Sequence, residues 1–381
     1  MARQRSERDW ADLPADLVTT IAEKASTTNT QYIHLRFVCK AWRRALIPNP
    51  CHLPPQSPWL LLPRFKEGFD PRIRGGFDCP DELNFYDPFR SKTHRFRLPY
   101  LSGKRICGSS HGWLVLEHDP RPRVSLFNPI TQSSIDLPSL DDPPTILRSA
   151  PSGRFILKAT LSGNPSEDGC AVVAWFSQYT NWELGFCRIG DTHWTDLLMG
   201  HERQYLLDFA CYKNLVYTVN LQKDVSVYDL HDLSESTFPS KIKYDRSYDQ
   251  INLVDGDSES AEPLIVRTTK YSTVNRISVY KWFNDMQQWH QVENIGKQVL
   301  FLDSKHCINL QLEEGRENQL YYDVRYSFSD NMHSSINGYF CVGVNVMHLK
   351  SRMPVSLQHS PTCIYLFYAF EFPMWVTPSL I

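Results

Sequence analysis

The chain has 381 residues, which predicts a small unit beside a larger body rather than one ordinary domain. Its 40 Lys and Arg residues nearly balance its 42 Asp and Glu residues. The chain therefore has no strong overall electrostatic field that would favour nucleic acid or a membrane surface as its partner. Aromatic residues at 13% and 25 prolines favour strands and turns over long helices.

Three features of the sequence bear on the cellular compartment of the protein. The first ten residues are charged and lack an apolar segment, so we expect no secretory signal. No run of about eighteen apolar residues exists, so we expect no membrane span. The ten cysteines are scattered singly without a CxxC pair, which is typical of reduced thiols and not of a disulfide framework or a zinc site. We expect a protein of the nucleus and/or cytoplasm with no cofactor.

Residues 1–9 are expected to be a flexible N-terminus, and two stretches after them predict helices. Apolar residues recur at helical spacing in 9–25 and again in 34–46. Pro14 suits a first helical turn, while Pro48 and Pro50 prevent continuation past Leu46. A helical unit of about 10–47 seldom buries enough surface to stand alone. The sequence therefore predicts that its apolar face meets a partner.

Residues 48–58 contain five prolines and predict a stiff, extended connector. After it, a unit of two short strands around an Asn- or Asp-containing turn recurs. The copies cover 83–99, 124–138, 184–197, 225–239, 277–292 and, in degenerate form, 339–355.

A repeat of roughly forty to fifty residues with about four strands predicts a β-propeller over 59–381. We expect six blades, with seven as the alternative. A ring needs a closing device, and the strand-forming segment 362–381 is expected to pack beside the first blade near Trp59–Leu62.

The N-terminal stretch resembles an F-box over about 10–47. Leu13-Pro14, Asp16-Leu17 and Ile21 match the opening helix of that family, and the run from Leu35 to Arg43 matches the closing one. The remainder is similar to the plant KIB-type propeller. That similarity is carried by the FNP and YDP turns, GWLVL and the terminal PMWVTPSL, whereas 319–336 departs from the late-blade pattern.

The resemblance implies that the helical unit docks on a Skp adaptor, which links to a cullin. The propeller would then hold an unknown protein substrate for ubiquitination. Carried over position by position, the implied adaptor-binding residues are Leu13, Pro14, Leu17, Ile21, Val38, Cys39 and Trp42. Substrate-binding residues stay unknown, and the loops 141–153, 162–169, 255–263 and 327–337 are candidates that nothing ranks.

Other chemistry has weaker support. Gly108-Ser109-Ser110-His111-Gly112 formally satisfies the nucleophile-elbow motif, but that motif needs a helix after the turn and the residues that follow here predict a strand. We expect a glycine-rich turn between blades instead. The acidic cluster of Asp255, Asp257 and Glu259 lacks the glycine and the glutamate of a calcium loop.

The basic residues Arg36, Lys40, Arg43 and Arg44 could suggest a DNA-reading helix, but that helix uses its apolar residues for packing. We expect a solvated or adaptor-complementary face instead, and no nucleic acid partner.

The main hypothesis is a non-catalytic substrate receptor of an SCF-type ubiquitin ligase. Two alternatives stay open at this point. One is a propeller enzyme, such as a hydrolase, with accessory helices. The other is an F-box scaffold that binds its adaptor without promoting degradation.

Overall fold

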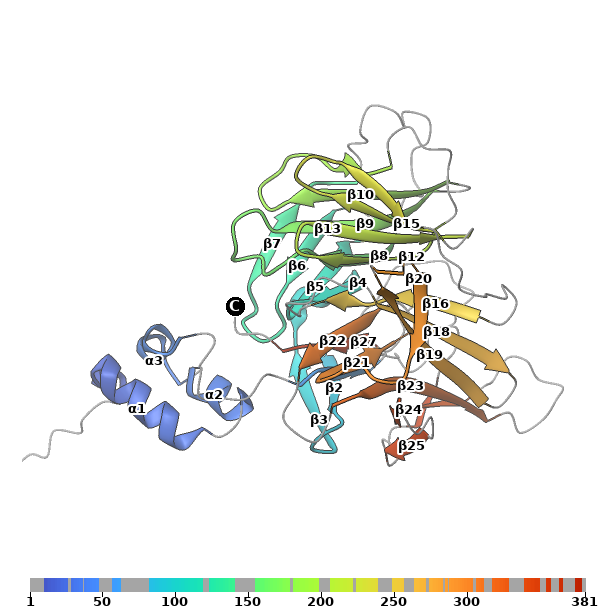
Figure 1. Ribbon diagram of the computed structural model, residues 1–381. Helices are drawn as coiled ribbons and strands as arrows, with labels where there is room; N and C mark the ends of the chain where they lie inside the picture. The colour runs from blue at the N-terminus through green and yellow to red at the C-terminus, as the bar shows by residue number, and fades with distance from the viewer. Residues whose placement is uncertain are drawn as a thin grey trace, which may run out of the picture.

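The computed structural model shows three short helices followed by a six-bladed β-propeller (Figure 1). The structure describes residues 10–26, 29–36, 38–47, 57–62, 82–118, 123–140, 155–178, 181–198, 206–221, 224–238, 249–256, 264–271, 274–283, 285–286, 288–303, 306–311, 317–328, 339–349, 354–357, 363–365 and 374–378.

Each of the first five blades is a four-stranded antiparallel sheet, and we number the blades 1 to 6 along the chain. Blade 1 is made of β27 (Met374–Val376), β1 (Trp59–Leu62), β2 (Glu82–Asp87) and β3 (Lys92–Arg97). Blade 2 is made of β4 (Lys104–Ser110), β5 (Trp113–His118), β6 (Val124–Phe127) and β7 (Ser134–Leu137). Blade 3 is made of β8 (Phe155–Leu161), β9 (Ala171–Gln178), β10 (Asn181–Arg188) and β11 (Thr195–Asp196).

Blade 4 is made of β12 (Leu206–Tyr212), β13 (Leu215–Asn220), β14 (Val225–Asp229) and β15 (Glu235–Phe238). Blade 5 is made of β16 (Asp249–Leu253), β18 (Leu264–Tyr271), β19 (Val274–Phe283) and β20 (Gln288–Val292). The six-blade prediction is confirmed, and each of the six sequence copies falls on the two outer strands of one blade.

The recurring turn between the outer strands has a physical basis that is repeated in three blades. Asn128 Oδ1 accepts hydrogen bonds from the backbone N–H of Ile130 and of Thr131, at 2.9 and 3.0 Å. Asp87 does the same in blade 1, and Asp229 accepts one such bond in blade 4. This Asx geometry turns the chain by itself, so the FNP and YDP motifs specify hairpins locally.

Blade 6 departs from the simple order. It contains β22 (Cys307–Gln311), β21 (Gln298–Leu302), β23 (Gln319–Phe328), β24 (Tyr339–His348) and β25 (Pro354–Leu357), with β26 (Cys363–Tyr365) also on β24. Strands β21 and β23 pair in parallel, and the short β17 (Asp255–Gly256) crosses from blade 5 to pair in parallel with β22. The degenerate copy at 339–355 itself forms an ordinary antiparallel pair of β24 with β25, so the irregular pairing of blade 6 lies in its other strands.

The ring is closed by β27, as the sequence predicted. Leu60 of β1 lies opposite Trp375 of β27 in an antiparallel pair. The Trp375 side chain is fully buried, and its indole Nε1 donates to the Leu302 carbonyl oxygen of blade 6 at 3.0 Å. One strand from late in the chain therefore joins the first blade to the last.

Apolar side chains form a layer between every pair of neighbouring blades, which gives six layers around the ring. Blades 2 and 3 approach each other closely at Gly108. A Cβ added to Gly108 of β4 would lie 1.8 Å from the Ala159 carbonyl oxygen of β8. Glycine is required there because any side chain would push these two strands apart.

A turn η1 (Trp10–Asp12) and the helices α1 (Ala15–Ala25), α2 (Asn29–Arg36) and α3 (Lys40–Ala45) precede the propeller. Pro14 immediately precedes α1, and its carbonyl oxygen accepts the first helical hydrogen bond from Val18 N at 3.1 Å. The prediction of continuous helix over 34–46 was wrong. Cys39 is extended, and its Sγ accepts from Trp42 N at 3.4 Å, so it caps α3 after a break.

The domain boundaries at 9/10, 47/48 and 58/59 stay predictions, as does a separate F-box domain. Residues 1–9 and 48–56 of the expected tail and connector lie outside the described part of the chain.

We predict that Trp375→Ala destabilises the propeller by about 3–5 kcal/mol, because it leaves a large cavity between blades 6 and 1. Denaturant unfolding monitored by circular dichroism would measure this. Trp10→Ala is the matched control, since that side chain is 66% exposed. Equal stability losses in the two variants would contradict the proposed role of β27 as the closing strand.

Candidate functional site

The three helices pack around a small core that ties both ends of the unit together. Trp42 of α3 is only 4% exposed, and its indole Nε1 donates to the Trp10 carbonyl oxygen at 2.8 Å. Tyr32 of α2 is also buried, and its hydroxyl donates to the Ile47 carbonyl oxygen at 2.9 Å. These two bonds fix the segments that enter and leave the unit, so its outer surface has a defined shape.

The seven residues implied for adaptor binding fall into three groups of exposure. Leu17 is 48% exposed, Val38 is 54% exposed and Pro14 is exposed as well. A second group is half-buried and contributes to both core and surface, namely Leu13, Ile21 and Cys39. Trp42 lies in the core, where it supports the surface from beneath. The docking role of these seven residues stays a prediction.

Two further residues extend this surface, and the sequence reasoning did not include them. Trp10 is 66% exposed and Ile47 is 56% exposed. A signal for Trp10 was present, because it lies three positions before Leu13 and so adjoins the apolar series. We call Trp10, Leu17, Val38 and Ile47 the exposed apolar set.

The exposed apolar set concentrates in a small part of the chain. Among the described residues, eight large apolar side chains are exposed, and four of these lie within residues 10–47. The other four are spread over blades 3, 4 and 5, from Phe155 to Met286. Because exposed apolar patches often mark interaction surfaces, this part of the chain is a candidate for one.

The helical core continues into the layer between blades 1 and 2. At this joint the imidazole of His94 in β3 stacks on the indole of Trp59, with ring centroids 4.4 Å apart and an interplanar angle of 10°. Burial lowers the pKa of His94, and the nearby positive charges of Lys92, Arg90 and His34 lower it further against the opposing effect of Asp87. His94 is thus held neutral where helices and propeller meet.

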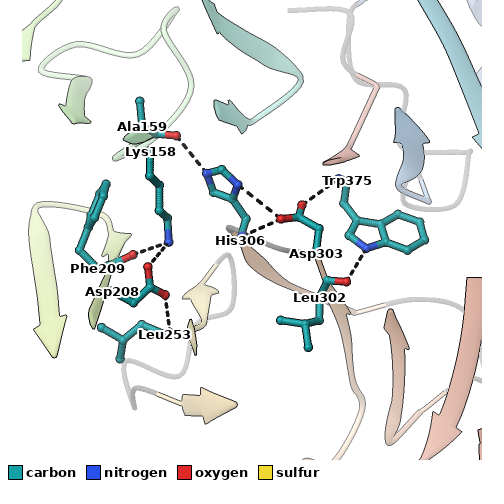
Figure 2. A network of polar contacts seen from close by, with 9 residues as sticks. All are labelled: Lys158, Ala159, Asp208, Phe209, Leu253, Leu302, Asp303, His306 and Trp375. Carbon is teal, nitrogen blue, oxygen red and sulfur yellow. Dashed lines mark hydrogen bonds and ion pairs between the residues drawn. The ribbon is translucent and has the colours of Figure 1, made fainter. Parts of the chain in front are cut away.

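A second candidate site is the buried polar network near the propeller axis (Figure 2). Lys158 of β8 donates to Asp208 Oδ1 of β12 at 2.8 Å and to the Phe209 carbonyl oxygen at 2.6 Å. The second carboxylate oxygen of Asp208 accepts from Leu253 N of blade 5 at 2.8 Å. One buried ion pair therefore joins blades 3, 4 and 5.

The other half of the network centres on blade 6. His306 Nε2 donates to the Ala159 carbonyl oxygen of blade 3 at 3.2 Å, across the ring from it. Asp303 Oδ1 accepts from His306 N at 2.7 Å, and its Oδ2 accepts from Trp375 N of β27 at 3.0 Å. Two of these three hydrogen bonds reach backbone atoms of blades 3 and 1, so the arrangement joins blades.

The remaining sequence candidates can be placed only in part. The stretch from Gly108 to Gly112 is a hairpin in which β4 ends at Ser110 and β5 begins at Trp113, with φ of 50° at His111 and 80° at Gly112. A nucleophile elbow needs a helix after the turn, and a strand follows here instead, as predicted. The expectation that this turn lies between blades was wrong, because β4 and β5 both belong to blade 2.

The acidic cluster and most of the candidate substrate loops fall where the chain is not described. Asp255 lies in β17, while Asp257 and Glu259 lie outside the described residues. The loop 162–169 is the β8–β9 connection. Loop 141–153 and most of 255–263 and 327–337 are outside the described residues.

Among the described residues, no group of three or more His, Cys, Asp or Glu side chains could hold a metal ion. No helix in that part of the chain is both long and apolar enough to cross a membrane.

Comparison with known proteins gives a consistent result. A family model described as KIB1-4 β-propeller matches residues 83–341. The Arabidopsis thaliana F-box/kelch-repeat protein At1g57790 is 22% identical over 315 residues, which cover 79% of either chain. F-box/kelch-repeat protein At3g18720 of the same plant is 24% identical and covers 86% of this chain and 83% of its own. F-box protein At2g14290 of that plant is 25% identical, covering 78% and 81% respectively.

Breaking the buried ion pair is expected to destabilise the propeller strongly. Lys158→Met leaves the Asp208 carboxylate buried without its cation, which costs about 3–5 kcal/mol. Adding Asp208→Asn removes the charge and keeps an oxygen for Leu253 N, so the double variant should recover much of the loss. Urea unfolding of both variants tests this, and a double variant less stable than Lys158→Met would contradict the pairing.

The neutral His94 predicts a loss of stability in acid. Its pKa is lower in the folded than in the unfolded chain, so the unfolded chain binds more protons as pH falls below about 6.5. Stability contributed by this group is complete above that pH and is lost as pH falls towards the folded pKa.

The variant His94→Phe keeps the stack on Trp59 and should lose less stability between pH 7.5 and 5.5 than the parent, as thermal melts would record. His118, whose pKa is also lowered chiefly by burial, would account for part of the remaining loss. An unchanged pH dependence in His94→Phe would be evidence against a neutral His94.

Proposed function

The chain belongs to the KIB1-4 β-propeller family, and on that premise we propose that it is the substrate-recognition subunit of an SCF-type ubiquitin ligase. Its curated relatives are named F-box proteins, and the helices occupy the stretch that resembles an F-box. The single observation that carries the proposal is the exposed apolar set, gathered on a helical unit ahead of the propeller.

The exposed apolar set would supply part of the free energy that docking requires. Complete burial of a large apolar side chain contributes about 1.5–3 kcal/mol, and these four are already about half buried. Burial of the exposed apolar set would therefore contribute a few kcal/mol, before any costs, to the free energy of docking. Burial of Pro14, Leu13 and Ile21 would add to this contribution. Association entropy offsets part of this gain, so polar contacts at the rim must supply the remainder.

The proposed partners are a Skp adaptor and, through it, a cullin, with an unidentified protein substrate on the propeller. The protein itself performs no chemical step in this proposal. A conjugating enzyme carried by the cullin would lie near a lysine of the bound substrate, and linkage raises the effective concentration of the two groups. The nucleus and/or cytoplasm is the proposed location.

The rigidity of the propeller serves this mechanism. Six apolar layers and the inter-blade hydrogen bonds of Lys158, Asp208 and His306 hold the blades in fixed relation. A substrate held on a rigid body stays at a constant distance from the docking helices, because the helical core continues into the layer between blades 1 and 2. The exposed apolar set and the propeller loops thus act as two ends of one receptor.

We predict that Leu17→Ala combined with Val38→Ala weakens capture of a purified Skp adaptor by about tenfold or more, because truncating two central apolar contacts removes at least 1.4 kcal/mol. Pull-down followed by titration calorimetry would measure the change. Leu233→Ala is the matched control, since Leu233 is 42% exposed on the β14–β15 turn of blade 4.

Circular dichroism should be unchanged in all three proteins, because none of the substituted side chains is buried. Full adaptor capture by the Leu17/Val38 variant would refute the proposed docking surface. Trp42→Ala is a poor test by comparison, because it removes the core beneath that surface.

A further inference from the structure

The outer strand of blade 1 differs in charge from the outer strands of the other five blades. Strand β3 has the sequence KTHRFR, with exposed Lys92, Arg95 and Arg97. The corresponding strands β7, β11, β15, β20 and β25 contain no Lys or Arg. Charged residues often protect sheet edges from aggregation, but five edges of this ring manage without basic ones. Protection alone therefore does not explain β3.

The basic side chains lie on both faces of the β3 edge. Thr93 pairs with Tyr86, which faces the layer between blades 6 and 1, so Arg95 and Arg97 point to that side as well. Lys92 alternates with them and shares the other face with His94, near His34 of α2. Among the described residues, β3 pairs on one side only, with β2.

Further cations lie on the helices that precede the propeller. Lys40, Arg43 and Arg44 of α3 are exposed, and α3 packs on α2. Arg36 at the end of α2 is half-buried, and its Nη1 atom is buried without a hydrogen-bond partner. Burial lowers the pKa of Arg36, and the charge of Arg43 lowers it further against the opposing effect of Tyr32. The positive charges here lie close enough to oppose one another.

Nearby acids only partly offset these charges. Asp87 lies 3.7 Å from Arg90 and is otherwise occupied by the turn that follows β2. Glu82 lies opposite Arg97 on β2. No Asp or Glu occurs in the sequence between Glu23 and Glu67. Strand β3 and the helices α2 and α3 therefore each have an excess of basic residues, on a chain whose net charge is −2.

We propose that the outer edge of β3 binds an acidic, extended polypeptide segment of a partner protein as a fifth strand of blade 1. Two complementary interactions support this occupant. The side of β3 that pairs with no described strand offers backbone donors and acceptors to an added strand, and the cations on both faces of the edge attract its acidic side chains. Strand β3 is also six residues long, whereas the other outer strands have two to five.

Nucleic acid suits this surface less well. Single-stranded nucleic acid binds through aromatic platforms beside basic residues. The aromatic rings of β3 are turned inward: His94 stacks on Trp59, and Phe96 packs edge-on against Phe85 at 5.6 Å. Use of this edge for a ubiquitination substrate rests on the proposed function, whereas binding of the acidic segment does not.

The test uses the full-length chain without any adaptor, so that its outcome is independent of SCF assembly. The probe is a fluorescein-labelled peptide of five Glu-Thr repeats, which favours an extended strand and places its acids on one face. Fluorescence anisotropy at low ionic strength measures its affinity. A second probe of the same sequence carries N-methyl groups at alternate residues and cannot complete the backbone pairing.

The test variant is Arg95→Glu with Arg97→Glu. Its matched control is Arg276→Glu with Lys297→Glu, two exposed basic residues of the blade 5 region that change the net charge equally. We expect the β3 variant to lose affinity by about fivefold or more, because two exposed attractive charge pairs become repulsive. The control variant should bind as the parent does, and the N-methylated probe should bind more weakly to the parent.

Three outcomes would overturn the proposal. The first is no measurable binding of the Glu-Thr probe by the parent at low ionic strength. The second is equal binding by the two charge-reversal variants, which would reveal only a response to net charge. The third is preference for a single-stranded oligothymidine over the peptide, with loss of that preference in the β3 variant, which would assign the edge to nucleic acid. Adaptor capture should be unaffected by the β3 substitutions.

Discussion

The structure depends on the pairing of two strands that lie far apart in the chain. Strand β1 follows the helices directly, and β27 comes from near the C-terminus, yet they pair from Trp59 opposite Val376 to Leu61 opposite Met374. The partner of β27 on the other side is blade 6, through the backbone and indole N–H groups of Trp375. Every inter-blade layer benefits from this pairing, because an open ring would expose an apolar face at each end.

A second set of interactions, the buried polar contacts, joins blades near the propeller axis. The Lys158–Asp208 pair links blades 3, 4 and 5, while His306 reaches from blade 6 to blade 3. Buried charges of this kind add little net stability compared with apolar packing, but they tolerate only one relative position of the strands. In this chain they fix which blades meet at the axis, and the apolar layers supply the main driving force.

Features of the fold that depend on interactions within a few residues could be predicted from the sequence, whereas features that depend on contacts between distant residues could not. The outer strand pairs were found because alternation and an Asx turn such as that of Asn128 act within a few residues. The irregular pairing of blade 6 was not predicted, because the parallel contact between β21 and β23 has no local signature in the sequence. The buried network was also invisible, as His306 and Ala159 are 147 residues apart in the sequence. Apolar spacing correctly marked the helical unit, yet it could not separate buried Trp42 from exposed Val38 or foresee the cap at Cys39.

The late position of β27 has a consequence for biosynthesis. About three hundred residues separate β1 from its closing partner, so at typical rates of synthesis β1 waits about 15–60 s for that partner. The helices leave the ribosome before any blade does, and their apolar surface exists before the ring. During this interval the apolar surface of the helices is open to the chaperones of the cell. A chain that lacks β27 would still form the helices but would have a propeller that cannot close.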